Sequence, residues 1–579
     1  MPTFQSFRGR QYFAPAVIVD VKNELVAPPP LGKSIAIFGD FPQLESQKVH
    51  TFSQSGAYTI EELFPKVAKL NNYAKFWKTS GQDVTGQANA ISFVNCGTNT
   101  QAQKIHQDES AANSAIFYSR LWGVFGNSVT YTLLGPTELP AELDEEGPNY
   151  YKISMTAPGF DATSLQYKFG SSAQLQFSCD AAVSELSIED GVFTYTPTGA
   201  SQQTLNLIDY ADMDSFKDAF DALSHGTSLT QLSILAYDVK PIELDEIDTS
   251  ISLDGSLSLY AHSKALEHGL EGLGAAPIYV EFNAGTYAKR YRLLDTASGA
   301  LILTGGTQSS ATSANYLSVF SDADMIAKDF TSIACESTSA TVHGYVKNYL
   351  NESEISQKER NAWLAAPADS SIDTIYSSYV LPLNDKRISV VGQSITYLNY
   401  LGQETSGGPE VLAVLLCALQ GALPIAQPLT SQVPSLIDTE EVWSREGAGV
   451  ADSLVRKGIT ALKLNLNNEI AVIRSVTSYL KDNLLQNCEV SSRESIDASV
   501  RDMRVYLSSE LGTTISSSSK DKLKNLAEKR LKLHVDRGII KAYNNVKVRV
   551  QGDVAYVDYD VALTNPLNFI RITANVVAN

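Results

Sequence analysis

The two ends of this chain share one sequence pattern and its middle has another, and this arrangement constrains the fold most. Short apolar runs typical of buried strands, "KSIAIFG" at 33–39 and "AISFVNCG" at 90–97, alternate with helix-like stretches near the N-terminus, and similar texture returns after about residue 380. Between about 145 and 375, Ser, Thr and Gly separate short alternating stretches such as "FTYTPTG". We therefore predict an α/β (α+β) core domain formed by both ends of the chain, with inserted, mainly β domains.

The length of 579 residues supports this division, because it exceeds what a single hydrophobic core holds. We expect an N-terminal arm and Pro spacer at 1–30, the first part of the core at 31–145, the insertion at 146–375, the second part of the core at 376–564, and a C-terminal arm strand at 565–579. The spacer contains three consecutive prolines, Pro28 to Pro30, which are stiff and extended.

The net charge of −19 argues against nucleic-acid binding, which needs a basic surface. The charge is also uneven along the chain. From Glu441 to the end there are 20 Lys and Arg residues against 16 Asp and Glu residues, a net of +4, so the preceding part carries −23. Such asymmetry indicates that different parts of the chain face different partners.

The cysteines and the apolar runs predict a protein made in a reducing compartment and not exported by the classical route. There is no CxxC pair among the five cysteines, which are Cys96, Cys179, Cys335, Cys417 and Cys488. The N-terminal residues lack the apolar run of a signal peptide. The longest apolar stretch, "VLAVLLCALQGALPIA" at 411–426, is short for a membrane span and is interrupted by Gly421 and Pro424, so we expect a buried helix and no membrane insertion.

Motifs for catalysis or cofactor binding are missing from the sequence. "LGKS" at 31–34 has the end of a phosphate-binding loop, but Ala27 stands where the loop needs a glycine. The seven histidines form no HExxH pair, no GxSxG elbow is present, and the acidic clusters lack EF-hand spacing. We therefore predict a protein that is not an enzyme and that has no catalytic residues, metal or cofactor.

Two amphipathic helices are predicted near the C-terminus. The first begins with a capping box, Ser491-x-x-Glu494, and its apolar face comprises Ile496, Val500, Met503, Leu507 and Leu511. The second covers about 520–535 and is followed by Gly538 as a C-cap signal. Its basic residues are Lys520, Lys522, Lys524, Lys529, Arg530 and Lys532. They form either a solvated helix side or a docking surface for an acidic partner.

Strands are predicted at both ends of the chain. The stretch 17–21 alternates, and so does "VAYVDYDV", in which Val557, Tyr559 and Val561 share one face. Asn565-Pro566 marks a corner before a last apolar strand, "NFIRITANVV". An unpaired apolar edge invites another chain, although this strand could also fold back on its own sheet. Further upstream, "AANSAIFYSRLWGVFGNSVTYTLL" at 111–134 predicts a helix, a Gly-marked turn and a strand.

The order of these C-terminal elements resembles the contractile tail sheath proteins of myovirus-type phages and related contractile injection systems. The matching features, over roughly 449–577, are "GVADSLVRKGITALKLN", "AVIRSVTS", "IDASVRDMRVYLSSEL", "LHVDRGII", "VKVRV" and "NPLNFIRITANVV". At the front, "APAVIVDV", "KSIAIFGDFP" and "LWGVFGNSVTYTLL" are similar to the family's arm, first core strand and WGN turn, here Phe125-Gly126-Asn127 with Trp122 displaced by three residues.

The resemblance implies a subunit of hexameric rings that stack helically around a tail tube and contract to drive the tube through a cell envelope, without nucleotide hydrolysis. It implies arms that add strands to a neighbour's sheet, here through Val17, Ile18, Val19, Phe569, Ile570, Ile572 and Val576. Lys522, Lys529 and Lys532 would face the tube. Other implied partners are the baseplate and tail terminator proteins, and the implied location is the virion, after synthesis and assembly in the host cytoplasm.

Two other functions remain open from the residues alone. A surface adhesin or glycan-processing protein would use the β-rich middle and would need carboxylates and aromatic side chains that converge in a cleft. Another self-assembling tube or shell protein would share the terminal strands but would not form striated cylinders of two lengths.

Overall fold

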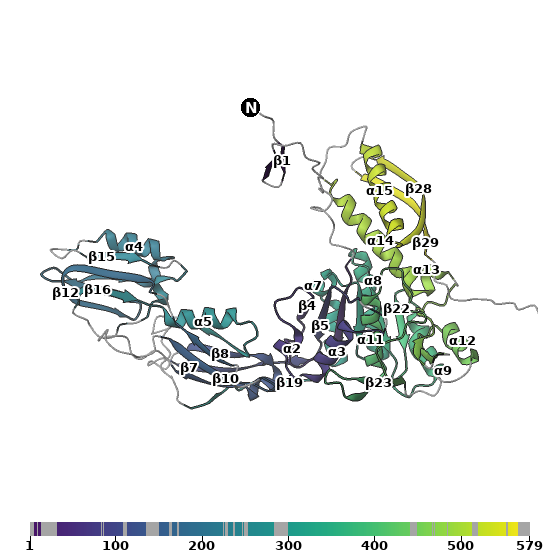
Figure 1. The fold of residues 1–579 in the computed structure, drawn as a ribbon, viewed down its shortest axis with the longest axis horizontal. Coiled ribbons are helices and arrows are strands. Elements are labelled where there is room, and N and C mark those ends of the chain that lie inside the picture. Colours follow the sequence, from purple (N-terminus) through teal and green to yellow (C-terminus); the bar gives the residue numbers. More distant parts are fainter. Residues whose placement is uncertain are drawn as a thin grey trace, which may run out of the picture. The chain divides into compact units, whose positions relative to one another are not determined.

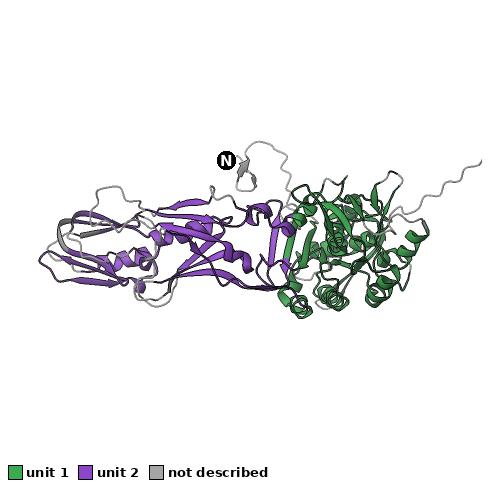
Figure 2. Ribbon diagram, turned by 90° about the horizontal axis from the view of Figure 1, so that it is seen from below, with its two compact units in different colours: residues 1–39, 72–93, 313–579 green, residues 40–71, 94–312 purple. Residues whose placement is uncertain are grey.

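The structure is a computed structural model that describes residues 5–7, 10–12 and 32–564; within the last range it omits 83, 85, 108–112, 135–149, 161–164, 171–172, 224, 226–229, 236–237, 246, 248–252, 283–298, 440–447, 466, 468, 483, 512–518 and 552–553. The chain forms two compact units (Figure 2). Unit 1 comprises Met1–Gly39, Asn72–Phe93 and Ser313–Asn579, and unit 2 comprises Asp40–Asn71 and Val94–Thr312. The predicted limits divide the chain differently, since 40–71 and 94–145 fall in unit 2 and 313–375 falls in unit 1.

A buried parallel sheet forms the centre of unit 1 (Figure 1). Five of the six strands of this sheet lie in the order β22 (Ile388–Val391), β21 (Asn361–Ala365), β20 (Ser332–Cys335), β3 (Ser34–Gly39) and β5 (Ala90–Asn95), and β4 (Val49–Ser53) follows β5. Strand β20 pairs in parallel with both β3 and β21, and β21 pairs in parallel with β22. Continuous apolar runs are expected here because helices cover both faces of such a sheet.

Helices α11 (Pro409–Ala422) and α8 (Ala340–Ile355) cover opposite faces of this sheet. The Ile35 side chain approaches Gly421 of α11, whereas the Phe38 ring packs on Tyr349 of α8 with centroids 6.0 Å apart. Residues three apart in a strand point to opposite faces. Helix α11 is apolar all round and almost entirely buried, as the sequence predicts. It carries one buried amide, Gln420, which accepts hydrogen bonds from the side chains of Trp363 (2.7 Å) and Ser332 (3.1 Å).

Shorter elements complete the body of unit 1. An antiparallel sheet has the order β24 (Glu404–Gly407), β23 (Ile395–Leu398), β25 (Asp438–Thr439), and a second pairs β26 (Leu462–Leu464) with β27 (Ile470–Val472). The β26–β27 pair lies within "KGITALKLNLNNEIAVIRSVTSYL" at 457–480 and is antiparallel. The remaining elements are the hairpin of β1 (Gln5–Phe7) and β2 (Arg10–Tyr12), and the helices α3 (Ala68–Lys78), α6 (Ser313–Ser321), α7 (Ala323–Ala327), α9 (Ile372–Ile375), the π-helix η4 (Tyr376–Val380), α10 (Leu381–Leu383), α12 (Ala448–Arg456) and α13 (Leu485–Cys488).

The C-terminal part of unit 1 packs two long helices against a hairpin (Figure 1). These elements are α14 (Val490–Ser508), α15 (Ser519–Asp536), β28 (Ile540–Gln551) and β29 (Val554–Leu563). Their apolar core comprises Met503, Ala527, Leu531, Ile539, Ile540 and Val546. Gly538, with φ of +70°, ends α15 as predicted, because glycine adopts this left-handed conformation at little cost. The strand predicted at 554–561 is confirmed as part of β29, whereas the predicted last strand lies outside the described residues.

Unit 2 is mainly β. One sheet has the order β11 (Gln166–Phe169), β10 (Tyr151–Thr156), β9 (Thr130–Leu134), β18 (Leu301–Ile302), and another has β17 (Ile278–Phe282), β8 (Asn113–Trp122), β7 (Gln101–Gln107). Helix α5 (His262–Gly272) packs on β17. The unit also contains β4 (Val49–Ser53), α2 (Ile60–Leu63), the short pair β6 (Thr98–Asn99) and β19 (Gln308–Ser309), and the 3₁₀ turn η1 (Gly123–Ser128).

A separate hydrophobic core lies within unit 2 between Leu175 and Ala261. Its sheet has the order β14 (Gln203–Asn206), β13 (Val192–Pro197), β12 (Leu175–Glu189), β15 (Thr230–Ile234), and β16 (Leu253–Leu259) also pairs with β12. Helix α4 (Met213–Asp221) adds Phe216 and Phe220 to an aromatic cluster around Phe193. Two 3₁₀ turns, η2 (Leu207–Asp209) and η3 (Pro241–Glu243), complete this part.

The helix predicted at the start of 111–134 is wrong, because β8 occupies Asn113–Trp122. From Ala115 to Trp122, buried residues alternate strictly with half-buried ones, which is the period of a strand. Phe117 stacks on Tyr131 of β9 at 4.8 Å between centroids. The Gly-marked turn and the strand after it are confirmed as η1 and β9.

Candidate functional site

The β28–β29 hairpin is the first part of the candidate site. Its strands pair antiparallel from Ile540–Leu563 to Gln551–Val554, and within the described part of the chain neither strand pairs with any other. Each strand therefore has one edge of backbone groups without a strand partner there. A two-stranded hairpin is marginally stable alone, and this one depends on its packing against α15 and α14.

The two faces of the hairpin differ as the sequence predicts. Val557, Tyr559 and Val561 pack toward the helices. The opposite face exposes Tyr556, and Arg549 forms a cross-strand ion pair with Asp558 at 3.1 Å. Both partners of that pair are more than half exposed, so it contributes about 0–1 kcal/mol. The hairpin is thus a platform supported by two helices, and no other strand of the described residues covers its outer edges.

Helix α15 is the second part of the site. It exposes some of the predicted basic residues, whereas others pair with acidic side chains. Lys529 and Lys532 are exposed, and within the described residues neither has an acidic partner at ion-pair distance. Lys522 is also exposed but pairs with Glu510 at 2.6 Å, and Lys524 pairs with Glu528 at 3.7 Å. Arg530 instead turns toward α14, so the freely available basic surface is smaller than the sequence suggests.

The predicted start of α14 is wrong. The helix begins at Val490 with Glu489 as N-cap, and no side chain caps it. Ser491 and Glu494 lie in the first turns with buried side chains and form no capping box. The predicted apolar face is also incorrect in part, because Leu511 is 81% exposed, whereas Met503 is buried.

The buried face of α14, the third part of the site, is polar. Only Val490, Ala498 and Met503 among its buried residues are apolar, and the polar ones are Ser491, Ser492, Glu494, Ser495, Asp497, Ser499 and Asp502. Buried charges require partners, and each of these carboxylates has a basic one. Glu494 pairs with Lys33 at 2.8 Å, Asp497 pairs with Arg387 at 2.9 Å, and Asp502 pairs with Arg530 and with His534.

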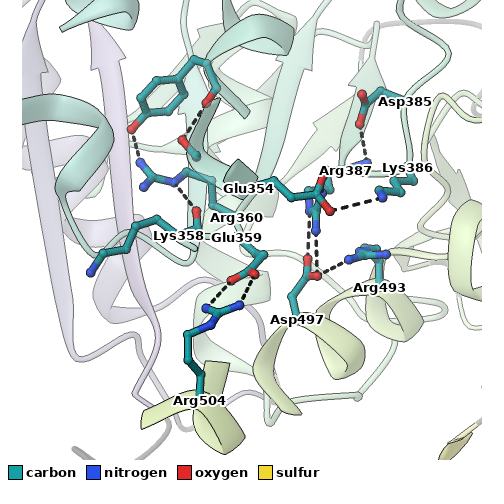
Figure 3. A network of polar contacts seen from close by, with 12 residues as sticks. Glu354, Lys358, Glu359, Arg360, Asp385, Lys386, Arg387, Arg493, Asp497 and Arg504 are labelled. Carbon is teal, nitrogen blue, oxygen red and sulfur yellow. Dashed lines mark hydrogen bonds and ion pairs between the residues drawn. The ribbon is translucent and has the colours of Figure 1, made fainter. Parts of the chain in front are cut away.

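Arg387 is the centre of the network drawn in Figure 3, where three segments of unit 1 meet. It precedes β22, and its Nε and Nη2 donate to the two oxygens of Asp497 at 3.1 and 2.9 Å. Its Nη1 donates to Glu354 of α8. Arg493 donates to the same Asp497 from one helical turn away. Farther along α14, Arg504 forms a fork with Glu359, with bonds of 2.7 and 3.2 Å.

The pKa values of these carboxyl groups reflect competition between burial and charge. Burial raises the pKa of Asp497, but Arg493 and Arg387 outweigh it and hold that pKa below the ordinary range. For Asp502, burial is likewise outweighed by hydrogen bonds from His534 and Arg530, so its pKa is lowered. Burial dominates at Glu494, whose pKa is raised although Lys33 opposes the shift.

The other sequence-predicted positions are placed as follows. Val17, Ile18, Val19, Phe569, Ile570, Ile572 and Val576 lie outside the described residues. No helix in the described ranges is long and apolar enough to cross a membrane. Likewise, the described His, Cys, Asp and Glu side chains form no group of three or more that could hold a metal ion. Sequence reasoning missed the charged face of α14, although its run of Ser, Glu and Asp at helical spacing was visible.

The turn at Phe125-Gly126-Asn127 has a clear structural role in unit 2. A Cβ on Gly126 would lie 2.6 Å from the carbonyl oxygen of Leu121 and 2.8 Å from Cβ of Ala102, so the site admits only glycine. The Asn127 side chain donates to the carbonyl oxygen of Gly306 and accepts from its N–H, both at 2.8 Å. This turn therefore fixes the Gly-Gly loop at 304–307.

Comparisons with known proteins agree with the sequence motifs. No protein-family model matches the sequence. The tail sheath protein of Bacillus phage SP01 is 22% identical over 416 residues, which cover 68% of each protein. That of Mycobacterium phage Bxz1 is 24% identical over 273 residues, 45% of each protein. Among solved structures, a sheath tail protein of Listeria innocua matches with a TM-score of 0.55 at 11% identity and covers 93% of both chains. The resemblance to tail sheath proteins is confirmed, and the fold is theirs.

Proposed function

We propose that this chain, similar to phage tail sheath proteins in sequence and in fold, is the structural subunit of a contractile tail sheath. Its copies form hexameric rings that stack around a tail tube, and their contraction drives the tube through the target envelope. The role is non-enzymatic, and the protein is a component of the virion after assembly in the host cytoplasm. Its partners are further copies of itself, the tube protein, the baseplate and the tail terminator.

The observation that carries this proposal is the β28–β29 hairpin with its open edges. In the described residues neither outer edge has a strand partner, and the hairpin is held against two helices. Exposed edges of this kind normally attract another chain. The predicted arm strands, at 17–21 and 569–576, are the segments that would pair with this hairpin in a neighbouring subunit.

The strength of one such junction follows from ordinary magnitudes. A strand of this length forms about five backbone hydrogen bonds, each with a net contribution of about 0.5–1.5 kcal/mol. Burial of Ile570, Ile572 and Val576 adds roughly 1–2 kcal/mol each after the cost of ordering. Several kcal/mol per junction is small beside the core of one subunit, but it decides assembly because every subunit makes the contact.

A stop codon before Pro566 tests the proposal. We expect a subunit with a normal melting temperature that stays monomeric in sedimentation, while the full-length chain forms striated cylinders in negative-stain micrographs. If the last strand folds back on its own hairpin, truncation should instead lower the melting temperature clearly. A truncated chain that still builds full cylinders would refute exchange of the C-terminal arm.

A matched pair of full-length variants separates the two faces of the arm. Ile570→Asn with Ile572→Asn alters the apolar face, and Arg571→Gln with Thr573→Asn alters the other. We expect the first pair to prevent cylinder formation and the second to leave it nearly unchanged. Equal effects of the two pairs would contradict a strand that binds through one buried face.

A further inference from the structure

The N-terminal arm and the hairpin platform are connected through one helix. Lys33 lies directly before β3, at the point where the predicted arm and spacer end. Its side chain is turned inward and is 8% exposed, and its Nζ donates to the carbonyl oxygen of Gln420 in α11 at 2.7 Å. The same ammonium pairs with Glu494 of α14 at 2.8 Å, and the Glu494 side chain is also only 8% exposed.

The backbone at this position is fixed as well. The carbonyl oxygen of Lys33 accepts a hydrogen bond from the N–H of Asn89, and the N–H of Ser34 donates to the hydroxyl of Thr331 at 3.0 Å. Both ends of the lysine are thereby held: its backbone by the segments that precede β5 and β20, and its ammonium by α11 and α14. Lysine is rarely buried unless its charge is paired, so the ammonium group of Lys33 is held in one defined place by its partners.

Helix α14 continues from this contact to the platform. Asp502 lies eight residues after Glu494, about 12 Å farther along the helix. It is almost fully buried and binds both Arg530 and His534 of α15, and His534 Nδ1 lies 3.0 Å from the Ser499 hydroxyl. Helix α15 packs on β28. Between the two contacts, Asp497 fixes α14 to the sheet through Arg387.

We propose that the buried Lys33–Glu494 ion pair anchors the root of the N-terminal arm to α14, so that the arm and the β28–β29 platform of one subunit share one rigid base. Lys33 is then a positioning residue for assembly: it sets where the arm leaves the subunit relative to the platform. This inference rests on the proposed sheath function. It gives Lys33 and Glu494 a role in placing the arm, which is separate from strand pairing between arms and hairpin.

The physical reason is the conformational entropy that the N-terminal arm loses when assembly orders it. If the root is held, assembly orders only the arm residues that reach the neighbour. If it is released, the root residues must be ordered as well, and each additional residue lowers the assembly constant by about tenfold. A buried ion pair contributes little net stability compared with apolar side chains of similar volume, whereas loss of one partner alone is costly. The effect of the ion pair on the placement of the arm can therefore be measured separately from its effect on the stability of the subunit.

The test uses the full chain with Lys33→Met and Glu494→Leu together, which replaces the pair by apolar side chains. We expect a melting temperature within a few degrees of the unmodified protein, faster amide hydrogen exchange at residues 32–34, and a critical concentration for cylinder formation raised about tenfold or more. The matched control is Lys264→Met with Glu243→Leu, an ion pair of 3.1 Å in unit 2 that is remote in sequence from the arm and from α14. It should leave the critical concentration unchanged.

The following results would contradict the anchor role of the Lys33–Glu494 pair or the proposed function. If the double variant is stable but assembles at the normal concentration, the pair has no positioning role. If the double variant unfolds, the isosteric Glu494→Gln variant, which removes the anion that pairs with Lys33, takes its place. Normal exchange at residues 32–34 together with normal assembly then overturns the anchor. If the unmodified chain itself forms no cylinders under any condition, the proposed function fails, which is a separate result.

Discussion

At the scale of single residues, buried polar side chains are held by specific partners. His343 of α8 is 1% exposed, and its Nε2 lies 2.8 Å from the carbonyl oxygen of Ser337. Its ring also packs edge-on against Tyr379. Burial lowers the pKa of His343 to about 4, because the charged imidazolium would lose its hydration. A histidine that stays neutral in the folded state makes stability depend on pH.

We predict that His343 makes the protein less stable in mild acid. The imidazole protonates in the unfolded chain near pH 6.5 but in the folded chain only near pH 4, so its contribution is complete above pH 6.5 and is lost as the pH falls toward 4. The loss amounts to about 3 kcal/mol. Urea denaturation of His343→Gln across this range should show a shallower pH slope than the unmodified protein or than His268→Gln, an exposed control. Identical slopes in all three proteins would contradict this role.

At the scale of elements, α14 differs from an ordinary amphipathic helix because its buried face carries charges. An apolar face sets the rotation of a helix through side-chain packing, which tolerates small shifts and repacking. Ion pairs with Lys33, Arg387 and Arg530 instead require one rotation and one axial position. This specificity has a cost, since loss of one partner leaves an uncompensated buried charge.

We therefore predict that Asp502→Asn destabilises the subunit by about 3–5 kcal/mol, because Arg530 and His534 lose their shared anion. Lys522→Met is the control: it breaks an ion pair on the same α15 in which the lysine side chain is 58% exposed. Its effect should remain below about 1 kcal/mol. Both values can be measured by urea denaturation. Equal, small effects would show that the buried network does not hold α15.

The exposed basic surface of α15 gives a second prediction at this scale. Lys529→Glu with Lys532→Glu should weaken attachment to an acidic tube roughly tenfold at low salt and much less at high salt, because exposed charges are screened. Self-association of the subunit should be nearly unchanged. Lys463→Glu with Lys66→Glu makes the same charge change at other exposed positions and serves as the control. Normal co-sedimentation of the first variant with tube at every salt concentration would exclude this docking role.

At the scale of the whole molecule, the two units carry very different charges. Unit 2 has 31 Asp and Glu residues against 13 Lys and Arg residues, a net of −18, while unit 1 has 33 against 32, a net of −1. The acidic excess of the chain thus belongs to the unit that lacks the hairpin and α14. A strongly acidic surface keeps an assembled particle soluble and repels polyanions.

We predict that residues 175–259 can be removed without loss of the remaining fold. This segment has its own core, and its two ends meet, since Gln174 N–H donates to the carbonyl oxygen of Leu259 at 2.8 Å. A short Gly-Ser linker should replace it, and the product should unfold cooperatively and still form cylinders. Deletion of 313–375 is the contrasting variant, because it removes β20 and β21 from the central sheet and should give no folded protein. Insoluble product from several versions of the first deletion would contradict an independent segment.

Much of the local structure could be predicted from patterns in the sequence. Alternation predicted β29, continuous apolar runs predicted β3 and β5, and the all-apolar stretch predicted α11, because the period of a pattern reflects the geometry of its own segment. Ordered motifs near the C-terminus indicated the tail sheath resemblance. These signals are local, and the helix predicted at the start of 111–134 was wrong because strand β8 forms there.

The buried side of α14 and the division into units could not be predicted in this way, because both depend on contacts between distant segments. The Ser, Glu and Asp residues of α14 read as a solvated face, because an isolated charge is expensive to bury. That cost is offset by Lys33, Arg387 and Arg530, and the first two lie more than 100 residues away in the chain. In the same way, Ser332–Cys335 belongs to the core because it pairs with β3, nearly 300 residues earlier. Contacts between distant segments leave no period in the sequence, so only the folded chain reveals them.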